Sequence, residues 1–141
     1  MVTHQLVINY WAVLIATVLY FVLGAFWYSP LMLGNQWKEL TQFDEKSRKG
    51  RMARYGITFA VELVLVFILL HFIHYSTAYT GVGGPLGGIQ TAFWAWLGFA
   101  ATTYYINNSF QGKSYQLFLI DSGYHLAGML LSGIILGAWS T

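Results

Sequence analysis

The chain has 141 residues, of which 57% are hydrophobic and only 9% are charged. Soluble globular domains carry about 25% charged residues, so this chain lacks the charge that would cover a water-facing surface. The absence of cysteine excludes disulfides, thiolate catalysis and cysteine-ligated iron–sulfur clusters. The length suits a single domain over residues 1–141. Composition therefore indicates an integral membrane protein.

Apolar segments long enough to cross a bilayer lie at 6–26, 55–74, 89–106 and 117–138. A helix rises about 1.5 Å per residue, so about 20 residues cross a hydrocarbon core of about 30 Å. The first segment is predicted to be a retained span and not a signal peptide, because no Lys or Arg precedes Lys38. The sequence therefore predicts an all-α membrane protein with four transmembrane helices in a bundle.

Positive charge is concentrated in two of the connections. Residues 31–54 hold six of the seven Lys and Arg residues, and Lys113 is the seventh. Connections rich in Lys and Arg stay in the cytoplasm. Both basic connections follow odd-numbered spans, so one orientation satisfies them both, with the N-terminus and the C-terminus outside.

The first basic connection also contains a local helical pattern. Leu33, Trp37 and Leu40 recur at the spacing of an apolar helical face, which predicts a short interfacial helix. Thr41 with Asp44 three residues later is a pattern that caps the start of a further helix.

The basic residues of this connection have two interpretations. The charges either only set the topology, or Arg48, Arg51 and Arg54 also bind anionic lipid. The connection has few aromatic residues, so nucleic-acid binding is not indicated.

Ionisable groups within the predicted spans are costly to bury and are candidates for function. Depths counted along the spans place one polar layer in the cytoplasmic half, with Asn107 and Asn108 at its mouth. The layer itself consists of Glu62, Asp121, His125, Thr102 and Thr103. Glu62 and His125 come out at similar depth, so we expect them to interact directly or through one water. Such a layer suits binding or passage of a proton, a cation or a small polar solute, or it is a structural network that holds the helices together.

Three histidines near the predicted outer face form a weak metal motif. His71 and His74 are three residues apart near the end of the second span, and His4 could join them. Solvated interfacial histidines explain the same pattern, so neither a metal nor any other cofactor is predicted.

Small residues in the last span indicate close helix packing. Gly133 and Gly137 form a GxxxG pattern, and Gly128 with Ser132 adds a second small pair. The close contact lies either within the bundle or between subunits. A homo-oligomer is predicted.

Three short stretches carry a family resemblance: Gly24-Ala-Phe-Trp-Tyr-Ser-Pro-Leu-Met-Leu-Gly-Asn-Gln-Trp37, Trp96-Leu-Gly-Phe99 and Ile120-Asp-Ser-Gly-Tyr-His125. Together they resemble the small bacterial membrane proteins grouped as domain-of-unknown-function family 1761. The resemblance implies a four-span inner-membrane protein and supplies no catalytic residues. Within the first stretch, Pro30 disfavours helix at Ser29 and ends the first span. Trp27 and Tyr28 either anchor that helix end or line the mouth of the polar layer.

The sequence thus predicts a multi-pass protein of a bacterial inner membrane whose activity is unknown. The leading hypothesis is binding or passage of a small solute or ion at the polar layer. The alternative is an accessory or scaffold protein that transports nothing. No P-loop, dinucleotide fingerprint, HExxH or GxSxG motif occurs in the chain, so an enzyme is not indicated.

Overall fold

The computed structural model describes residues 6–43 and 50–139. The elements in chain order are α1 (Tyr10–Trp27), α2 (Gly34–Thr41), α3 (Arg51–Thr80), α4 (Gly84–Ala95), the π-helical turn η1 (Trp96–Ala101), α5 (Thr102–Phe110) and α6 (Tyr115–Trp139). Within these described ranges there is no β-strand, which confirms the predicted all-α class.

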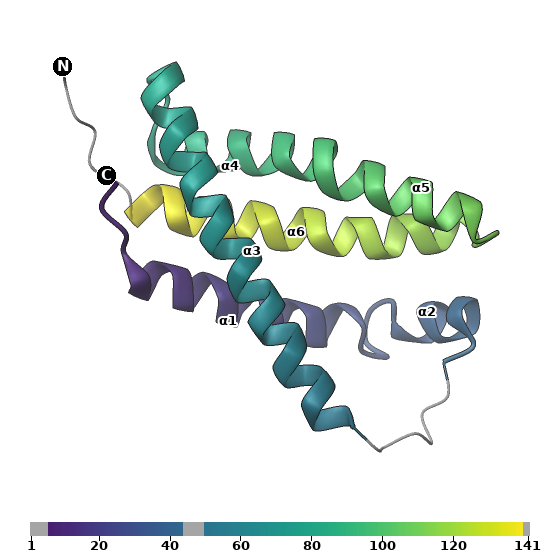
Figure 1. The fold of residues 1–141 in the computed structure, drawn as a ribbon. Helices are drawn as coiled ribbons and strands as arrows, with labels where there is room; N and C mark the ends of the chain where they lie inside the picture. The colour runs from purple at the N-terminus through teal and green to yellow at the C-terminus, as the bar shows by residue number, and fades with distance from the viewer. Residues whose placement is uncertain (1–5, 44–49, 140–141) are drawn as a thin grey trace.

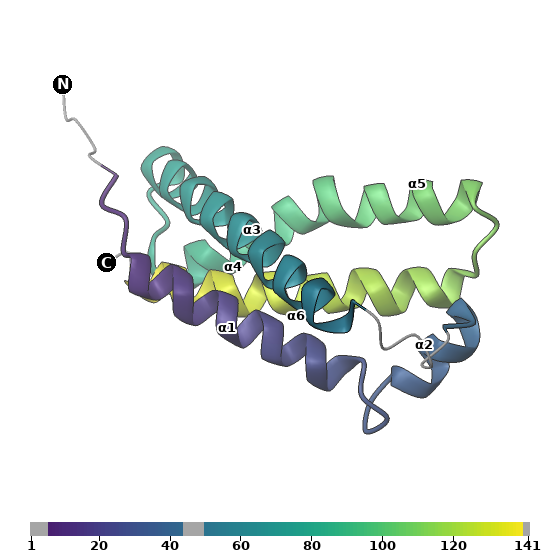
Figure 2. The same ribbon diagram turned by 60° about the horizontal axis from the view of Figure 1, so that its bottom comes forward.

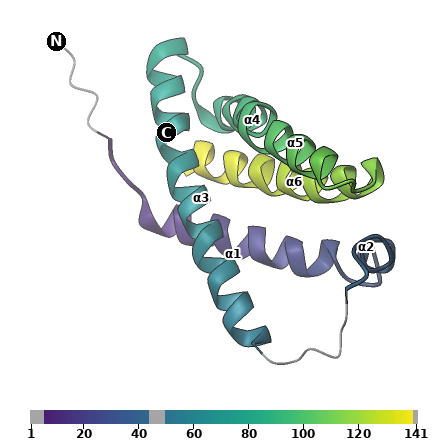
Figure 3. The ribbon, with the colours of Figure 1, turned by 45° about the vertical axis from the view of Figure 1, so that its right-hand side comes forward.

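The long helices form a bundle in which one member is strongly inclined. α1, α6 and the run from α4 to α5 lie side by side, and α3 crosses them obliquely (Figure 1). The second view shows α4 and α5 following α6 along its length (Figure 2). α2 lies beyond the end of α1, at the end of the bundle that also holds the turn between α5 and α6 (Figure 3). Lys38 of α2 and Lys113 of the α5–α6 turn therefore share one end of the molecule.

Three helices, α1, α3 and α6, are long and apolar enough to cross a membrane. Only 28% of the most apolar stretch of α3 is buried inside the chain, and the same fraction applies to α1. Apolar helix faces that the protein does not cover need another apolar environment. The chain is accordingly a membrane protein.

α1 begins and ends at residues whose chemistry explains its limits. The Asn9 side chain accepts a hydrogen bond from the backbone N–H of Ala12 at 3.2 Å, so the helix starts at Tyr10 and not at Leu6 as the apolar run suggested. The helix stops at Trp27, before the Ser29–Pro30 step that the sequence identified as its end.

A tight turn follows α1 and sets the position of α2. The N–H of Gly34 donates to the Ser29 carbonyl at 3.0 Å, and a Cβ at Gly34 would collide with the backbone of Tyr28 and Ser29. Only glycine allows this close approach. The predicted short helix in this connection is present as α2.

The predicted cap at Thr41 is wrong. Thr41 is the last residue of α2, and its hydroxyl donates to the Trp37 carbonyl of the same helix at 2.8 Å. α3 starts instead at Arg51, after Gly50 in a left-handed conformation with φ 82°. Asp44, Arg48 and the other residues of 44–49 lie outside the described residues.

The small residues of α6 pack within the chain. A Cβ at Gly133 would meet the backbone of Gly88, and a Cβ at Gly137 would meet the backbone of Gly84. The two helices thus present paired glycines to each other, which lets α4 and α6 approach closely. Of the two interpretations of the GxxxG pattern, the contact within the bundle is the one observed. Likewise, the ring of Tyr20 on α1 occupies the space that a Cβ at Gly128 would take.

Candidate functional site

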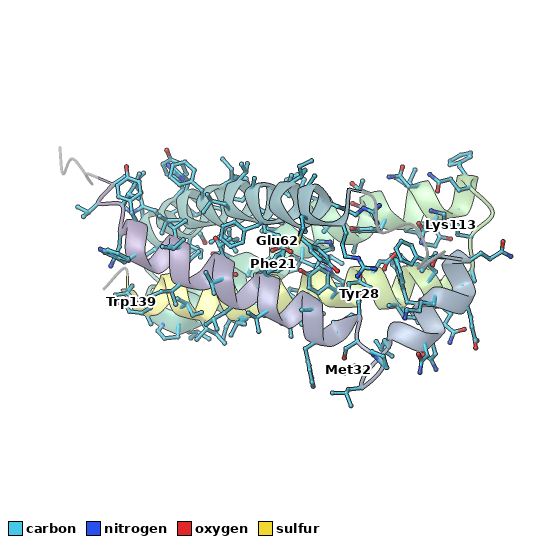
Figure 4. All side chains as sticks on the ribbon, turned by 90° about the horizontal axis from the view of Figure 1, so that it is seen from below. Phe21, Tyr28, Met32, Glu62, Lys113 and Trp139 are labelled. Atoms are coloured by element: carbon cyan, nitrogen blue, oxygen red, sulfur yellow. The ribbon has the colours of Figure 1, made fainter. Side chains whose placement is uncertain are left out.

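One face of α6 carries three ionisable side chains of the bundle interior. Asp121, Tyr124 and His125 are spaced at i, i+3 and i+4, so they project from neighbouring turns of one helix face. That face meets α1, α3 and α5. Glu62 of α3 lies near the middle of the bundle's length, and Tyr28 lies closer to the α2 end (Figure 4).

The imidazole of His125 is held between two tyrosines. The Tyr20 hydroxyl lies 2.6 Å from Nδ1, and the Tyr104 hydroxyl lies 2.9 Å from Nε2. The Tyr104 ring also stacks on the imidazole with an interplanar angle of 27°. A neutral imidazole has one N–H donor and one acceptor nitrogen. One tyrosine therefore donates to His125 while the other accepts from it.

Glu62 is the least exposed of the ionisable residues that the sequence singled out. The residue is only 4% exposed. Its Oε1 accepts a hydrogen bond from the Tyr124 hydroxyl. Its Oε2 is buried and has no hydrogen-bond partner within residues 6–43 and 50–139. A buried carboxyl oxygen without a hydrogen-bond partner is energetically costly. Binding of a proton, a water or a cation at this oxygen would remove that cost.

Asp121 lies one turn closer to the α2 end than His125. Its Oδ1 accepts a hydrogen bond from the Tyr28 hydroxyl at 2.9 Å. The side chain of Trp37 also reaches this carboxyl group, and Lys113 acts on it electrostatically. Burial, with the nearby Asp121 carboxylate second, raises the pKa of Tyr28 above its usual value. Tyr28 therefore stays protonated and donates to Asp121.

Glu62 and His125 are linked through tyrosines and not by a bond of their own. Tyr124 donates to Glu62 and lies beside Tyr20, with ring centroids 5.4 Å apart in an edge-to-face arrangement. Tyr20 in turn bonds His125. No direct bond between Glu62 and His125 is present, and the hydrogen-bond partner of each is a phenol.

The other residues of the predicted layer lie outside this network. Thr102 and Thr103 are exposed on α5, and the Thr102 hydroxyl donates to the Gly98 carbonyl of its own helical run at 2.7 Å. Asn107 is exposed, whereas Asn108 is buried at the turn between α5 and α6.

The Trp-Tyr-Ser-Pro block contacts α6 through its two aromatic side chains. Trp27 donates through Nε1 to the Ile120 carbonyl of α6 at 3.1 Å, while Tyr28 bonds Asp121. The Ser29 hydroxyl donates to the Phe26 carbonyl at 2.6 Å and helps to close the end of α1. Pro30 is exposed.

The sequence interpretation missed the tyrosines that complete the network. Tyr20, Tyr104 and Tyr124 are not distinguished by the sequence as site residues, since a phenol is common both in cores and at membrane interfaces. The sequence does contain a pattern that indicates which face of α1 carries the tyrosines. Tyr20, Gly24 and Tyr28 recur every four residues and so share a face of α1, and that face lies against α6.

The π-helical turn η1 aligns two aromatic side chains with α6. Trp96 donates to the Ser122 carbonyl at 2.8 Å, and Tyr104 bonds His125. In a regular α-helix, with about 100° per residue, residues eight apart point about 80° away from each other. A π turn takes up roughly one extra residue, which reduces that difference to about 20°. The turn thus allows both side chains to face α6.

The weak metal motif gains no support from the described residues. The His71 Nδ1 lies 2.8 Å from the Phe67 carbonyl of its own helix, and the His74 ring packs on Tyr75. His4 lies outside the described residues. Among the part of the chain that the structure describes, no three His, Cys, Asp or Glu residues are grouped to hold a metal ion.

The fold and this network define a helical membrane protein with ionisable side chains in its interior. Residues 11–137 match the family described as protein of unknown function (DUF1761). The chain belongs to that family, as its sequence motifs suggested. No curated protein and no solved structure matches the chain.

Proposed function

We propose that α4, η1 and α5 together form a fourth membrane span and that both termini lie outside a bacterial inner membrane. The helical run from Gly84 to Phe110 has no break, and at about 1.5 Å per residue it is roughly 40 Å long. Each of its parts alone is too short to cross. The basic residues at the α2 end favour the cytoplasm for that end.

We further propose that the protein binds a proton or a small cation at Glu62 and passes it along the bundle. The observation that carries this proposal is the buried, unpartnered Oε2 of Glu62. An isolated carboxylate in a membrane interior is costly, so it gains strongly from a proton or a cation. Tyr124 holds the other oxygen in place and leaves Oε2 as the binding atom.

The Tyr20–His125–Tyr104 chain supports proton movement in particular. Each ring nitrogen of His125 has a hydroxyl partner. A proton taken up at one nitrogen can be balanced by release of a proton from the other, which exchanges the two tautomers. Asp121, one turn nearer the basic end, would exchange protons with the cytoplasm.

A scaffold protein is the second candidate, favoured by one feature of the same site. Both nitrogens of His125 are already satisfied by tyrosines, as expected for a network that fixes the positions of α1, α5 and α6. In that case Glu62 is permanently neutral, and the protein moves nothing.

Flux measurements on proteoliposomes separate these two functions. The wild type should carry protons or cations under an imposed membrane potential, read by a pH dye or a cation dye inside the vesicles. The flux of Glu62→Gln should be at least tenfold lower, because the amide keeps the shape but has no negative charge and takes up no proton. Glu39→Gln, the same change at an exposed residue of α2, is the matched control and should leave the flux unchanged. If the wild type carries neither, the scaffold is favoured.

Two proposals about partners stand apart from the polar network. We propose that Arg51 and Arg54 contribute to anionic-lipid binding at the cytoplasmic face. We also propose a homo-oligomer, although the glycine face of α6 no longer supports it because that face is occupied by α4. Cross-linking in native membranes, compared at two expression levels, tests self-association.

A further inference from the structure

A second polar site lies at the turn between α5 and α6, apart from Glu62. The pocket there is lined by the residues Tyr105, Asn108, Ser109, Lys113, Ser114, Tyr115 and Phe118. Lys113 lies at the far end of the bundle, beyond Tyr28 (Figure 4). Most of the polar side chains that line the pocket carry hydrogen-bond donors.

Asn108 gives this pocket an unmet hydrogen-bonding need. The residue is 7% exposed, and its Nδ2 is buried without a partner among the residues that the structure describes. Buried amide donors in proteins are nearly always bonded. An acceptor oxygen is therefore missing beside Asn108.

The start of α6 adds a second reason for an anion. The Ser114 hydroxyl accepts from the Leu117 N–H at 3.2 Å and so caps the helix. The first turn of a helix has N–H groups without partners inside the helix and carries partial positive charge. α6 is 25 residues long. Lys113, next to the cap, brings a full positive charge, part of which acts on Asp121.

We propose that this pocket binds a phosphate-bearing anion. A phosphate oxygen supplies the acceptor that Asn108 lacks, and its charge meets Lys113 and the start of α6. The hydroxyls of Ser109 and Tyr115 are further donors at the rim. With the fourth span as proposed, the turn lies at the level of the lipid headgroups on the cytoplasmic side, so a phospholipid headgroup and a free phosphate ion are the two sources of the ligand.

Native mass spectrometry of the full chain in a neutral detergent tests the site. Phosphatidylglycerol and the phosphate-free lipid diacylglycerol are added separately, and inorganic phosphate is added as a competitor. Lys113→Gln removes one charge at an exposed position of the pocket. Lys38→Gln removes one charge from α2, which lies at the same end of the molecule but outside the pocket, and is the matched control. Asn108→Asp removes the unpartnered donor.

We expect one phosphatidylglycerol to be retained by the wild type in strong preference to diacylglycerol. Lys113→Gln should weaken its binding about tenfold, as for one lost charge-assisted hydrogen bond, while Lys38→Gln should change it little. Competition by inorganic phosphate that depends on Lys113 would support the site with free phosphate as a ligand. Its absence, with the lipid effects intact, would support the headgroup.

Three results would overturn the proposal. The first is equal retention of the two lipids. The second is equal weakening by Lys113→Gln and Lys38→Gln, which would mean diffuse attraction to a basic surface. The third is unchanged binding in an Asn108→Asp variant that keeps the wild-type melting temperature. None of these results depends on whether Glu62 binds a proton.

Discussion

The phenol groups around His125 and Glu62 turn isolated ionisable residues into a connected network. Tyr20 and Tyr124 are buried, with exposed fractions of 0% and 7%, and both hydroxyls are engaged. A hydroxyl can both donate and accept, so each tyrosine can change the direction of its bond when a proton arrives. Carboxyl groups partnered by fixed donors lack that freedom.

Replacing Tyr104 with Phe should separate proton transfer from packing. The ring still stacks on His125, but Nε2 loses its partner, which should cost about 1–3 kcal/mol of stability. If His125 relays protons, the flux of the Tyr104→Phe protein should be at least tenfold lower than that of the wild type. Vesicle flux and thermal unfolding measure the two effects, and Tyr79→Phe, at a residue that is 93% exposed, is the control. Unchanged flux in a folded Tyr104→Phe protein would exclude the relay through His125.

At the scale of the elements, the helix pair α4 and α6 depends on backbone contact between glycines. Gly88 and Gly133 face each other so closely that neither tolerates a Cβ without a shift of the backbone. Since a membrane offers little hydrophobic drive between helices, such packing carries much of their association.

Substitution of Gly133 by Leu should therefore disturb the fold of the single chain. The side chain would have to push α4 away, and overpacking of this kind costs about 1–3 kcal/mol or more. The loss should appear as a lower melting temperature in detergent. Gly56→Leu on α3, where a Cβ would meet nothing within 4 Å, should leave it unchanged. Equal melting temperatures for both variants would contradict the packing of α4 on α6.

The sequence predicted the long helices well because apolar length alone requires them in a membrane. It brought Glu62 and His125 to similar levels along their helices, since a level follows from the rise per residue, and the structure places both beside the same pair of tyrosines. It could not predict the rotation of each helix about its axis. For this reason Thr102 and Thr103 were placed in the layer, although they face outward. The π turn of η1 brings Tyr104 to His125, and no sequence pattern of local propensity predicts such a turn.

At the scale of the whole molecule, the topology is open to a direct test. Lys38 of α2 and Lys113 of the α5–α6 turn lie at the α2 end, and Arg51 and Arg54 stand in the first turn of α3, so that end is predicted to be cytoplasmic. After Thr141, a reporter that works only in the periplasm should be active. After Gly112, a reporter that works only in the cytoplasm should be active. The opposite pattern would contradict the proposed orientation.

The central claim, that Glu62 takes up and releases a proton or a cation, is tested most directly by infrared difference spectroscopy. Purified protein in lipid is taken from alkaline to acidic buffer, and the carbonyl band of a protonated carboxylic acid is recorded. We predict a reversible band that is absent in Glu62→Gln and present in Glu39→Gln. A bound cation should lower the pH at which this band appears. A Glu62 that gives no pH-dependent band, in a protein that stays folded throughout, would contradict the account and leave a structural network.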